Sequence, residues 1–162
     1  MTSTMPLRIT PATPADVPMI LQLIRELAEF ERLLDEVHAT EEQLREQLFG
    51  PRPAAEVVIA RMGDEVAGFA LFFPNFSTFL AKPGIYLEDV YVQPSARGVG
   101  IGKALFCSVA KVAQDRACGR LEFAVLDWNQ PSIDFYLAHG AEAQSEWTMY
   151  RLDEAAISRI AK

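Results

Sequence analysis

The sequence predicts an α/β fold in which a central mixed, mostly antiparallel sheet is flanked by helices. Segments of strand-like composition are interleaved with segments of helical periodicity, in the order β-α-α-β-β-β-α-β-α-β. A glycine-rich turn, Arg97–Gly102, joins one strand-like run to an apolar helix. A chain of 162 residues is long enough to bury one core, and we expect residues 1–162 to form a single domain.

The N-terminal part is expected to hold one strand and two helices. Arg8–Pro11 has the length of a short first strand. Thr13 and the proline after it favour the start of a helix, and apolar residues recur at helical spacing as far as Phe30. Thr40–Gln43 matches a capping box, which predicts the start of a second helix.

Strands dominate the middle of the chain. Glu56–Arg61 and Val66–Phe73 flank a Met-Gly-Asp-Glu turn and predict a hairpin. Pro74–Pro83 is expected to be a loop, and Ile85–Val92 to be the next strand. The helix that follows the glycine-rich turn is expected over Lys103–Ala113, with its end near Gly119.

The C-terminal part is expected to begin with a strand at Leu121–Leu126. Asn129 then caps a short helix, Pro131–Ala138, and His139-Gly140 closes it. Trp147–Leu152 is expected to be the closing strand.

Composition narrows the possible functions. The net charge of −7 argues against nucleic acid as the main partner and is compatible with a cationic substrate. No apolar run reaches the ~20 residues of a membrane span, and the first six residues lack a signal core, so we expect no membrane partner and a cytoplasmic location. The only cysteines, Cys107 and Cys118, have no nearby histidine, so no metal site is expected.

Two better-known phosphate-binding loops do not fit the glycine-rich turn. A Walker A loop requires glycine where Arg97 stands and a hydroxyl residue where Ala104 stands. A dinucleotide fingerprint requires a third glycine where Lys103 stands. The unpaired N–H groups at the helix start, with the positive end of the helix dipole, suit a pyrophosphate. An ordinary glycine-rich connection is the alternative interpretation.

The pattern Arg-x-x-Gly-x-Gly after a strand resembles the acetyl-CoA pyrophosphate loop of the GCN5-related N-acetyltransferase superfamily. Two further stretches resemble the diamine acetyltransferase family. They are Tyr86–Val92 and Val125–Ser132, the second followed by the pairs Phe135-Tyr136 and Gly140-Ala141. That family contains spermidine/spermine N1-acetyltransferases and thialysine Nε-acetyltransferases, and the likeness covers nearly the whole chain. The amino-acid sequences of Glu88–Val92 and Leu126–Gln130 are closer to the thialysine branch than to the polyamine branch.

The resemblance implies an acetyl-CoA-dependent N-acetyltransferase that acts on a primary amine of a small cationic metabolite. The acceptor is expected to be a thialysine-like amino acid, a diamine or a polyamine, attacking acetyl-CoA directly in a ternary complex. Homodimers are expected by analogy with the family. Two alternatives stay open: an acetyltransferase of protein lysine or antibiotic amines, and a non-catalytic acetyl-CoA sensor.

Such a reaction requires a base, because a free alkylamine has a pKa of about 10 and only the neutral amine attacks. Glu88 is the candidate, because a carboxylate in an apolar strand is costly unless it is paired or functional. Strict alternation places it on one strand face with Tyr86 and Val90, and the opposite face then holds Leu87, Asp89 and Tyr91. The resemblance matches Glu88 to the family's active-site glutamate. A surface acid on an edge strand is the alternative.

Tyr136 is the candidate acid, because a phenol is protonated at neutral pH and can donate to a departing thiolate. Core packing of the Phe135-Tyr136 pair is the alternative, and the resemblance favours the family's general acid.

The resemblance also implies sites for the cofactor and the substrate. Cofactor contacts are expected at Val90, Tyr91, Val92, Arg97, Gly98, Val99, Gly100, Ile101, Gly102, Lys103, Asn129, Gln130, Pro131 and Ser132. Substrate contacts are expected at Phe30, Glu31, Glu88, Asp89, Glu122, Phe123 and Ala124. Thr78 and Leu80 stand where the polyamine enzymes carry an aspartate and a tryptophan, which favours a shorter amine.

Overall fold

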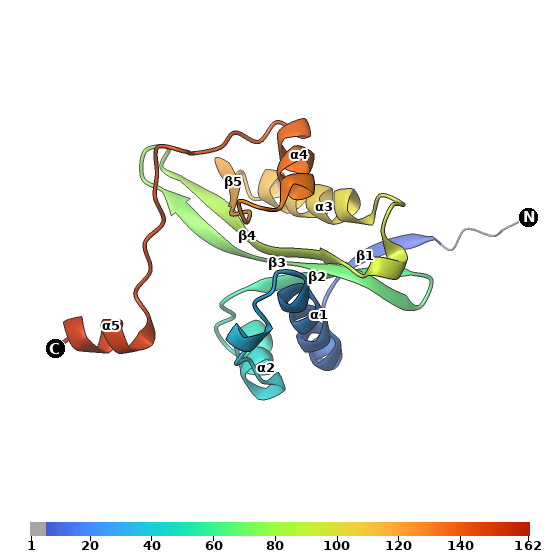
Figure 1. Ribbon diagram of the computed structural model, residues 1–162, viewed down its shortest axis with the longest axis horizontal. Helices are drawn as coiled ribbons and strands as arrows, with labels where there is room; N and C mark the ends of the chain where they lie inside the picture. The colour runs from blue at the N-terminus through green and yellow to red at the C-terminus, as the bar shows by residue number, and fades with distance from the viewer. Residues whose placement is uncertain (1–5) are drawn as a thin grey trace, which may run out of the picture. The chain divides into compact units, whose positions relative to one another are not determined.

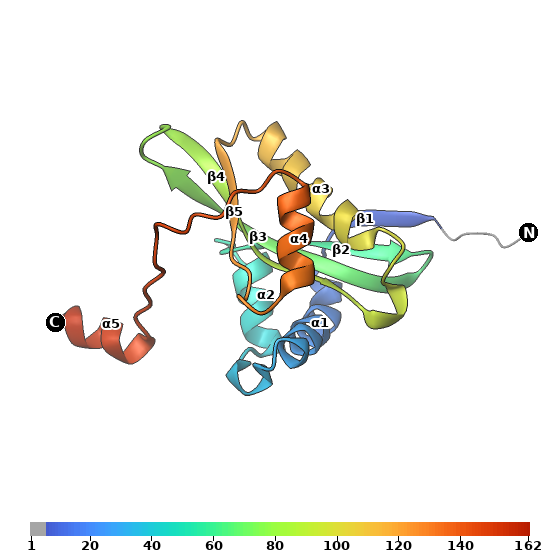
Figure 2. The ribbon, with the colours of Figure 1, turned by 45° about the horizontal axis from the view of Figure 1, so that its top comes forward.

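The computed structural model describes residues 6–162, which separate into two compact units, residues 6–124 and 125–162. The first unit contains a five-stranded sheet in the order β1-β2-β3-β4-β5. Its neighbours are antiparallel except for the parallel pair β4–β5, which lie side by side in Figure 2. The predicted mixed, mostly antiparallel sheet is therefore confirmed. The strands are β1 (Leu7–Pro11), β2 (Glu56–Met62), β3 (Glu65–Ser77), β4 (Lys82–Val92) and β5 (Arg120–Phe123).

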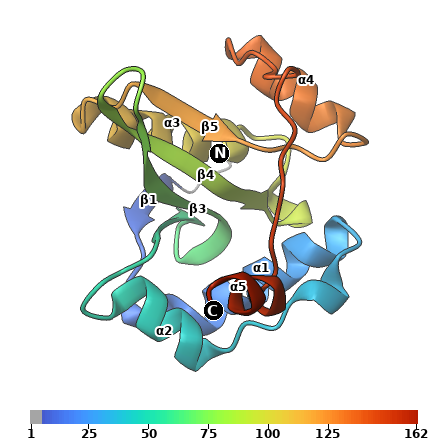
Figure 3. The same ribbon diagram turned by 90° about the vertical axis from the view of Figure 1, so that its left-hand side faces the viewer.

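Helices cover both faces of this sheet. Helices α1 (Val17–Phe30) and α2 (Glu41–Phe49) lie on one face and α3 (Ile101–Asp115) on the other (Figures 1 and 3). The capping box predicted at Thr40 forms, and a second one forms at Thr13, because each threonine has an acid or amide partner three residues on. A short 3-10 turn, Pro14–Asp16, precedes α1.

The apolar residues form one core on each side of the sheet. The α3-side core is centred on Ala70, Phe72, Ile85, Leu87, Ile101, Leu105 and Val109. The α1-side core is centred on Ile20, Leu23, Leu27, Val57, Ile59, Phe69 and Tyr91. β4 contributes to both cores, so its position is fixed from both sides.

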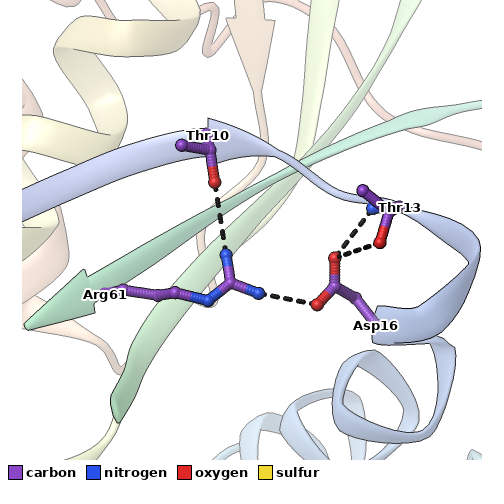
Figure 4. A network of polar contacts seen from close by, with 4 residues as sticks. All are labelled: Thr10, Thr13, Asp16 and Arg61. Atoms are coloured by element: carbon purple, nitrogen blue, oxygen red, sulfur yellow. Dashed lines mark hydrogen bonds and ion pairs between the residues drawn. The ribbon is translucent and has the colours of Figure 1, made fainter. Parts of the chain in front are cut away.

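A polar network attaches the start of α1 to the sheet (Figure 4). The Arg61 guanidinium donates to Asp16 Oδ1 at 2.6 Å and to Thr10 Oγ1 at 3.2 Å. The other Asp16 oxygen accepts from the backbone N–H and the hydroxyl of Thr13, at 2.7 and 3.0 Å. Side chains of the ion pair are only 23% and 16% exposed, so the guanidinium and the carboxylate depend on each other for solvation.

The prediction of a loop over Pro74–Pro83 is wrong. β3 and β4 stay paired from Phe73↔Tyr86 to Ser77↔Lys82, which leaves only residues 78–81 as the turn. The two prolines are tolerated because they lie at sheet edges: β2 pairs with β3 no further than Phe72, and β5 pairs with β4 only from Gly84 onward.

The second unit contains helices α4 (Gln130–Ala138) and α5 (Glu154–Ile160). Asn129 caps α4 as predicted, since its side chain accepts from Ser132 N at 3.3 Å. The strand predicted at Trp147–Leu152 is wrong: within residues 125–162 no strand forms, and the apolar side chains of this segment are exposed. Strand-like alternation alone does not supply a partner for the backbone hydrogen bonds.

None of the helices in residues 6–162 has the length and hydropathy of a membrane span.

We predict that Arg61→Met lowers the free energy of unfolding by about 1–3 kcal/mol, because it leaves the largely buried Asp16 carboxylate with fewer donors. Urea unfolding would measure the loss. Arg8→Met is the matched control, since Arg8 forms a 3.3 Å surface pair with Asp64, and should cost at most about 0.5–1 kcal/mol. Equal losses in the two variants would contradict this assignment.

Candidate active site

The glycine-rich turn has the conformation that an anion site needs. Gly98 and Gly100 have φ of +83° and +88°, in the left-handed region that favours glycine. A Cβ added at either position would meet no atom within 4 Å, so the backbone here faces open space. The first hydrogen bond of α3 runs from Ala104 N to Gly100 O at 3.0 Å. The N–H groups of the three residues before Ala104 therefore have no helical acceptor and can bind an anion.

An open strand edge lies between this turn and the parallel strand β5. β5 pairs with β4 from Gly84 to Leu87 and no further, whereas β4 continues to Val92. Residues 88–92 of β4 thus extend beyond the last pair with β5. An extended ligand arm can bond to such an edge as another strand would.

A β-bulge interrupts β4 where this open edge begins. Leu87 pairs with Phe72 and Asp89 pairs with Leu71, so Glu88 is an extra residue without an opposite partner in β3. Its side chain is exposed. The bulge therefore presents the Glu88 carboxylate to solvent at the point where β4 and β5 separate.

The bulge also reverses the faces of β4, so the strict alternation predicted past Glu88 is wrong. Leu87 packs in the α3-side core, and so does Val90, three residues later. Tyr91 packs in the α1-side core. Asp89, which lies between Leu87 and Tyr91 in the sequence, shares a face of the strand with Tyr91 and not with Leu87.

Three predicted substrate residues, Glu31, Glu88 and Asp89, form a group of carboxylates in which Glu31 and Glu88 lie near enough to Asp89 for their charges to act on it. Burial, together with the nearby negative charges of Glu88 and Glu31, raises the pKa of Asp89 to about 7. Burial also raises the pKa of Glu31. The group favours a cationic ligand, and Asp89 can exchange a proton near neutral pH.

The end of α1 is fixed by a Schellman motif. Arg32, with φ of +62°, donates its N–H to Glu29 O at 3.0 Å, and Leu33 N donates to Ala28 O at 2.7 Å. These bonds hold the predicted pair Phe30 and Glu31 at a defined position. The Phe30 side chain is 44% exposed.

Arg97 reaches from the glycine-rich turn toward this helix end. Its Nε donates to Val92 O at 2.9 Å. Its guanidinium carbon lies 5.1 Å from the ring centre of Phe30 and 5.5 Å from that of Tyr91. Both distances are within the range of cation–π attraction. Sequence reasoning did not foresee these contacts, because no local pattern pairs a loop arginine with a distant helix.

Glu122 and Phe123, which sequence reasoning assigned together, lie on opposite faces of β5. Glu122 accepts from Asn75 Nδ2 at 3.0 Å, across Gly84, where an added Cβ would lie only 2.3 Å from Asn75 Oδ1. The ring of Phe123 packs edge-on against Phe106 of α3 at 5.9 Å. Asn75 was missed because its segment was predicted to be a loop. Ala124, the third residue of this stretch, is exposed.

The remaining predicted cofactor and catalytic residues are divided between the two units. In the first unit, Ile101 is buried, whereas Val99 is 66% exposed and Lys103 is exposed. In the second unit, Asn129 is buried, and burial raises the pKa of Tyr136, which keeps its phenol protonated at neutral pH. The cofactor and catalytic residues predicted in this second unit are Asn129, Gln130, Pro131, Ser132 and Tyr136.

Comparison with known proteins connects this geometry to a family. Residues 20–141 match the profile of the Acetyltransferase (GNAT) family. A thialysine N-epsilon-acetyltransferase of Bos taurus is 40% identical, over 94% of this chain and 96% of that protein. The L-ornithine N5-acetyltransferase NATA1 of Arabidopsis thaliana is 36% identical, over 96% of this chain and 88% of that protein. The solved structure of an integron cassette protein from the mobile metagenome of V. cholerae has a TM-score of 0.80 at 26% identity, covering 96% of this chain and 98% of that one.

We predict that Asp89→Asn stabilises the protein at pH 8 but not at pH 4. Between the ordinary aspartate pKa and about 7, the folded state keeps a proton that the unfolded state has lost. Stability therefore falls as pH rises through this window, and the penalty stays constant above it. The asparagine variant escapes the penalty and should gain about 1–3 kcal/mol at pH 8, less than the full pKa shift implies, because water reaches part of the site.

Urea unfolding at the two pH values would measure this gain. Asp64→Asn is the matched control, because it removes the same group from an exposed turn, and it should change stability by less than about 0.5 kcal/mol. A gain for Asp89→Asn that is the same at pH 4 and pH 8 would refute the assignment.

Proposed function

The chain belongs to the Acetyltransferase (GNAT) family and is an N-acetyltransferase that acts on amines, and we propose that it moves acetyl from acetyl-CoA to the terminal primary amine of a small cationic metabolite. The acceptor class is a thialysine-like or ornithine-like amino acid, or a diamine. One observation carries the proposal: the open edge of β4 connects the anion-binding turn to the carboxylate group at Glu88.

The cofactor is proposed to lie along this edge. Its pantetheine arm pairs with the backbone of Val90–Val92, and its pyrophosphate binds the N–H groups of Gly98–Lys103. The Lys103 ammonium and the Arg97 guanidinium add positive charge there. Asn129–Ser132 at the start of α4 hold the same arm in this proposal, as the family resemblance implies.

The chemistry is proposed to be direct attack with both substrates bound. The amine nitrogen forms a bond to the acetyl carbon while the carbon–sulfur bond of the thioester breaks. The proton of the ammonium passes to a carboxylate, for which Glu88 and Asp89 are the two candidates, and Asp89 has its pKa matched to neutral pH. Tyr136 donates its phenolic proton to the departing thiolate. The second proton, which the nitrogen loses as the amide forms, passes through solvent and restores the phenol.

We further propose that the two units form one catalytic domain, since the family match, residues 20–141, crosses the boundary at 124. A homodimer in the cytoplasm is proposed from the family resemblance. Light scattering after size-exclusion chromatography tests the dimer.

The acceptor is best tested by measuring CoA thiol release with thialysine, ornithine, putrescine and spermidine. We predict that kcat/KM is at least about tenfold higher for an amino-acid amine than for spermidine, because Thr78 and Leu80 offer no carboxylate for a second distant ammonium. A preference for spermidine would contradict the acceptor class. Absence of turnover with every amine would contradict the proposed function.

We predict that Tyr136→Phe lowers kcat by about 10²-fold or more, because positioned general acids contribute that much. The affinity for acetyl-CoA should change little, since only a hydroxyl is lost. Tyr150→Phe is the matched control, because Tyr150 is 91% exposed in the same unit, and it should keep full activity. Unaltered turnover in the folded Tyr136→Phe enzyme would remove the residue from the mechanism.

A further inference from the structure

The Arg97 side chain contacts both β4 and the helix that carries the proposed substrate residues. Its guanidinium lies over the Phe30 ring, one residue before Glu31. It also lies over the Tyr91 ring, which is buried under α1. Arg97 thus joins the first residue of the cofactor turn to the last residue of α1.

A second contact attaches the same region to α1 one turn earlier. The Gln93 side-chain amide donates to both carboxylate oxygens of Glu26, at 3.3 and 3.2 Å. Glu26 and Phe30 are four residues apart and therefore lie on one face of the helix. An open pocket is lined by both residues together with Tyr91, Gln93 and Arg97. The turn and the helix end thus meet across this pocket.

From these contacts we propose that Arg97 is a positioning residue that couples occupation of the glycine-rich turn by acetyl-CoA to tight amine binding at Phe30 and Glu31. The inference rests on the proposed function. Stacking uses the flat face of a guanidinium and leaves its N–H edge to donate hydrogen bonds. A pyrophosphate bound to the turn accepts hydrogen bonds from the N–H edge of the guanidinium while its flat face stays stacked on Phe30. Because Arg97 is then held at both places, the end of α1 moves less before the amine binds.

The fold itself does not depend on this contact. Arg97 is exposed, and α1 is attached to the sheet by the buried side chains of Leu23, Leu27 and Tyr91. Variants of Arg97 are therefore expected to fold, so a loss of coupling can be separated from a loss of structure.

The test measures thialysine binding by calorimetry with and without CoA, which occupies the cofactor site and transfers no acetyl group. In the wild type, CoA should tighten thialysine binding about fivefold or more, within the usual range of coupling between sites. In Arg97→Met the factor should fall to about one, and adding Phe30→Leu should change it no further. Arg97→Lys should restore only part, since lysine keeps the charge but lacks the flat face.

Lys103→Met is the matched control. It also removes a positive charge beside the glycine-rich turn, but this charge belongs to the first turn of α3 and not to the residue stacked on Phe30. It should weaken CoA binding and keep the coupling factor. An unchanged factor in Arg97→Met, or an equal loss in Lys103→Met, would overturn the inference. A wild type that binds both ligands and turns over without coupling overturns the inference alone, whereas a wild type that binds neither ligand overturns the proposed function as well.

Discussion

The rest of the site depends on the single extra residue at Glu88, which turns one carboxylate to solvent in a strand that two cores otherwise bury from both faces. On one side of the bulge the strand completes the sheet with β5, and on the other side it leaves an open edge. The same insertion moves Asp89 and Tyr91 off the face of Leu87 and leaves Asp89 near Glu31. The glycine-rich turn, the open edge and the carboxylates of β4 are therefore successive parts of one chain segment, and a shift of one register position would separate them.

Holding the carboxylates of Glu31, Glu88 and Asp89 close together costs stability, and the rest of the fold must offset that cost. Asp89 is partly removed from water beside two other acids, and its raised pKa expresses that cost. The two cores offset it by anchoring β4 from both faces, and the Schellman motif offsets it by fixing the end of α1. A site rigid enough to hold three acids together is also ready for a cation before the cation arrives.

Local signals in the sequence were sufficient for the features that depend on near neighbours. The caps at Thr40 and Asn129 and the glycine-rich turn were predicted because each is determined within a few residues. The bulge was not predicted, since it depends on the pairing of β4 with β3 rather than on the composition of β4. For the same reason the prolines at 74 and 83 indicated a loop, and the alternation at 147–152 indicated a strand that has no partner among the described residues.

The geometry at Gly84 ties three strands together in a way that restricts how the protein can evolve. Asn75 of β3 reaches Glu122 of β5 only because β4 has no side chain between them. A mutation at Gly84 would displace the amide of Asn75 and leave the carboxylate of Glu122 without that donor, so each position limits what the other two accept. Diverging lineages are therefore expected to change these three positions as a set, whereas the exposed turn at 78–81 can vary one residue at a time.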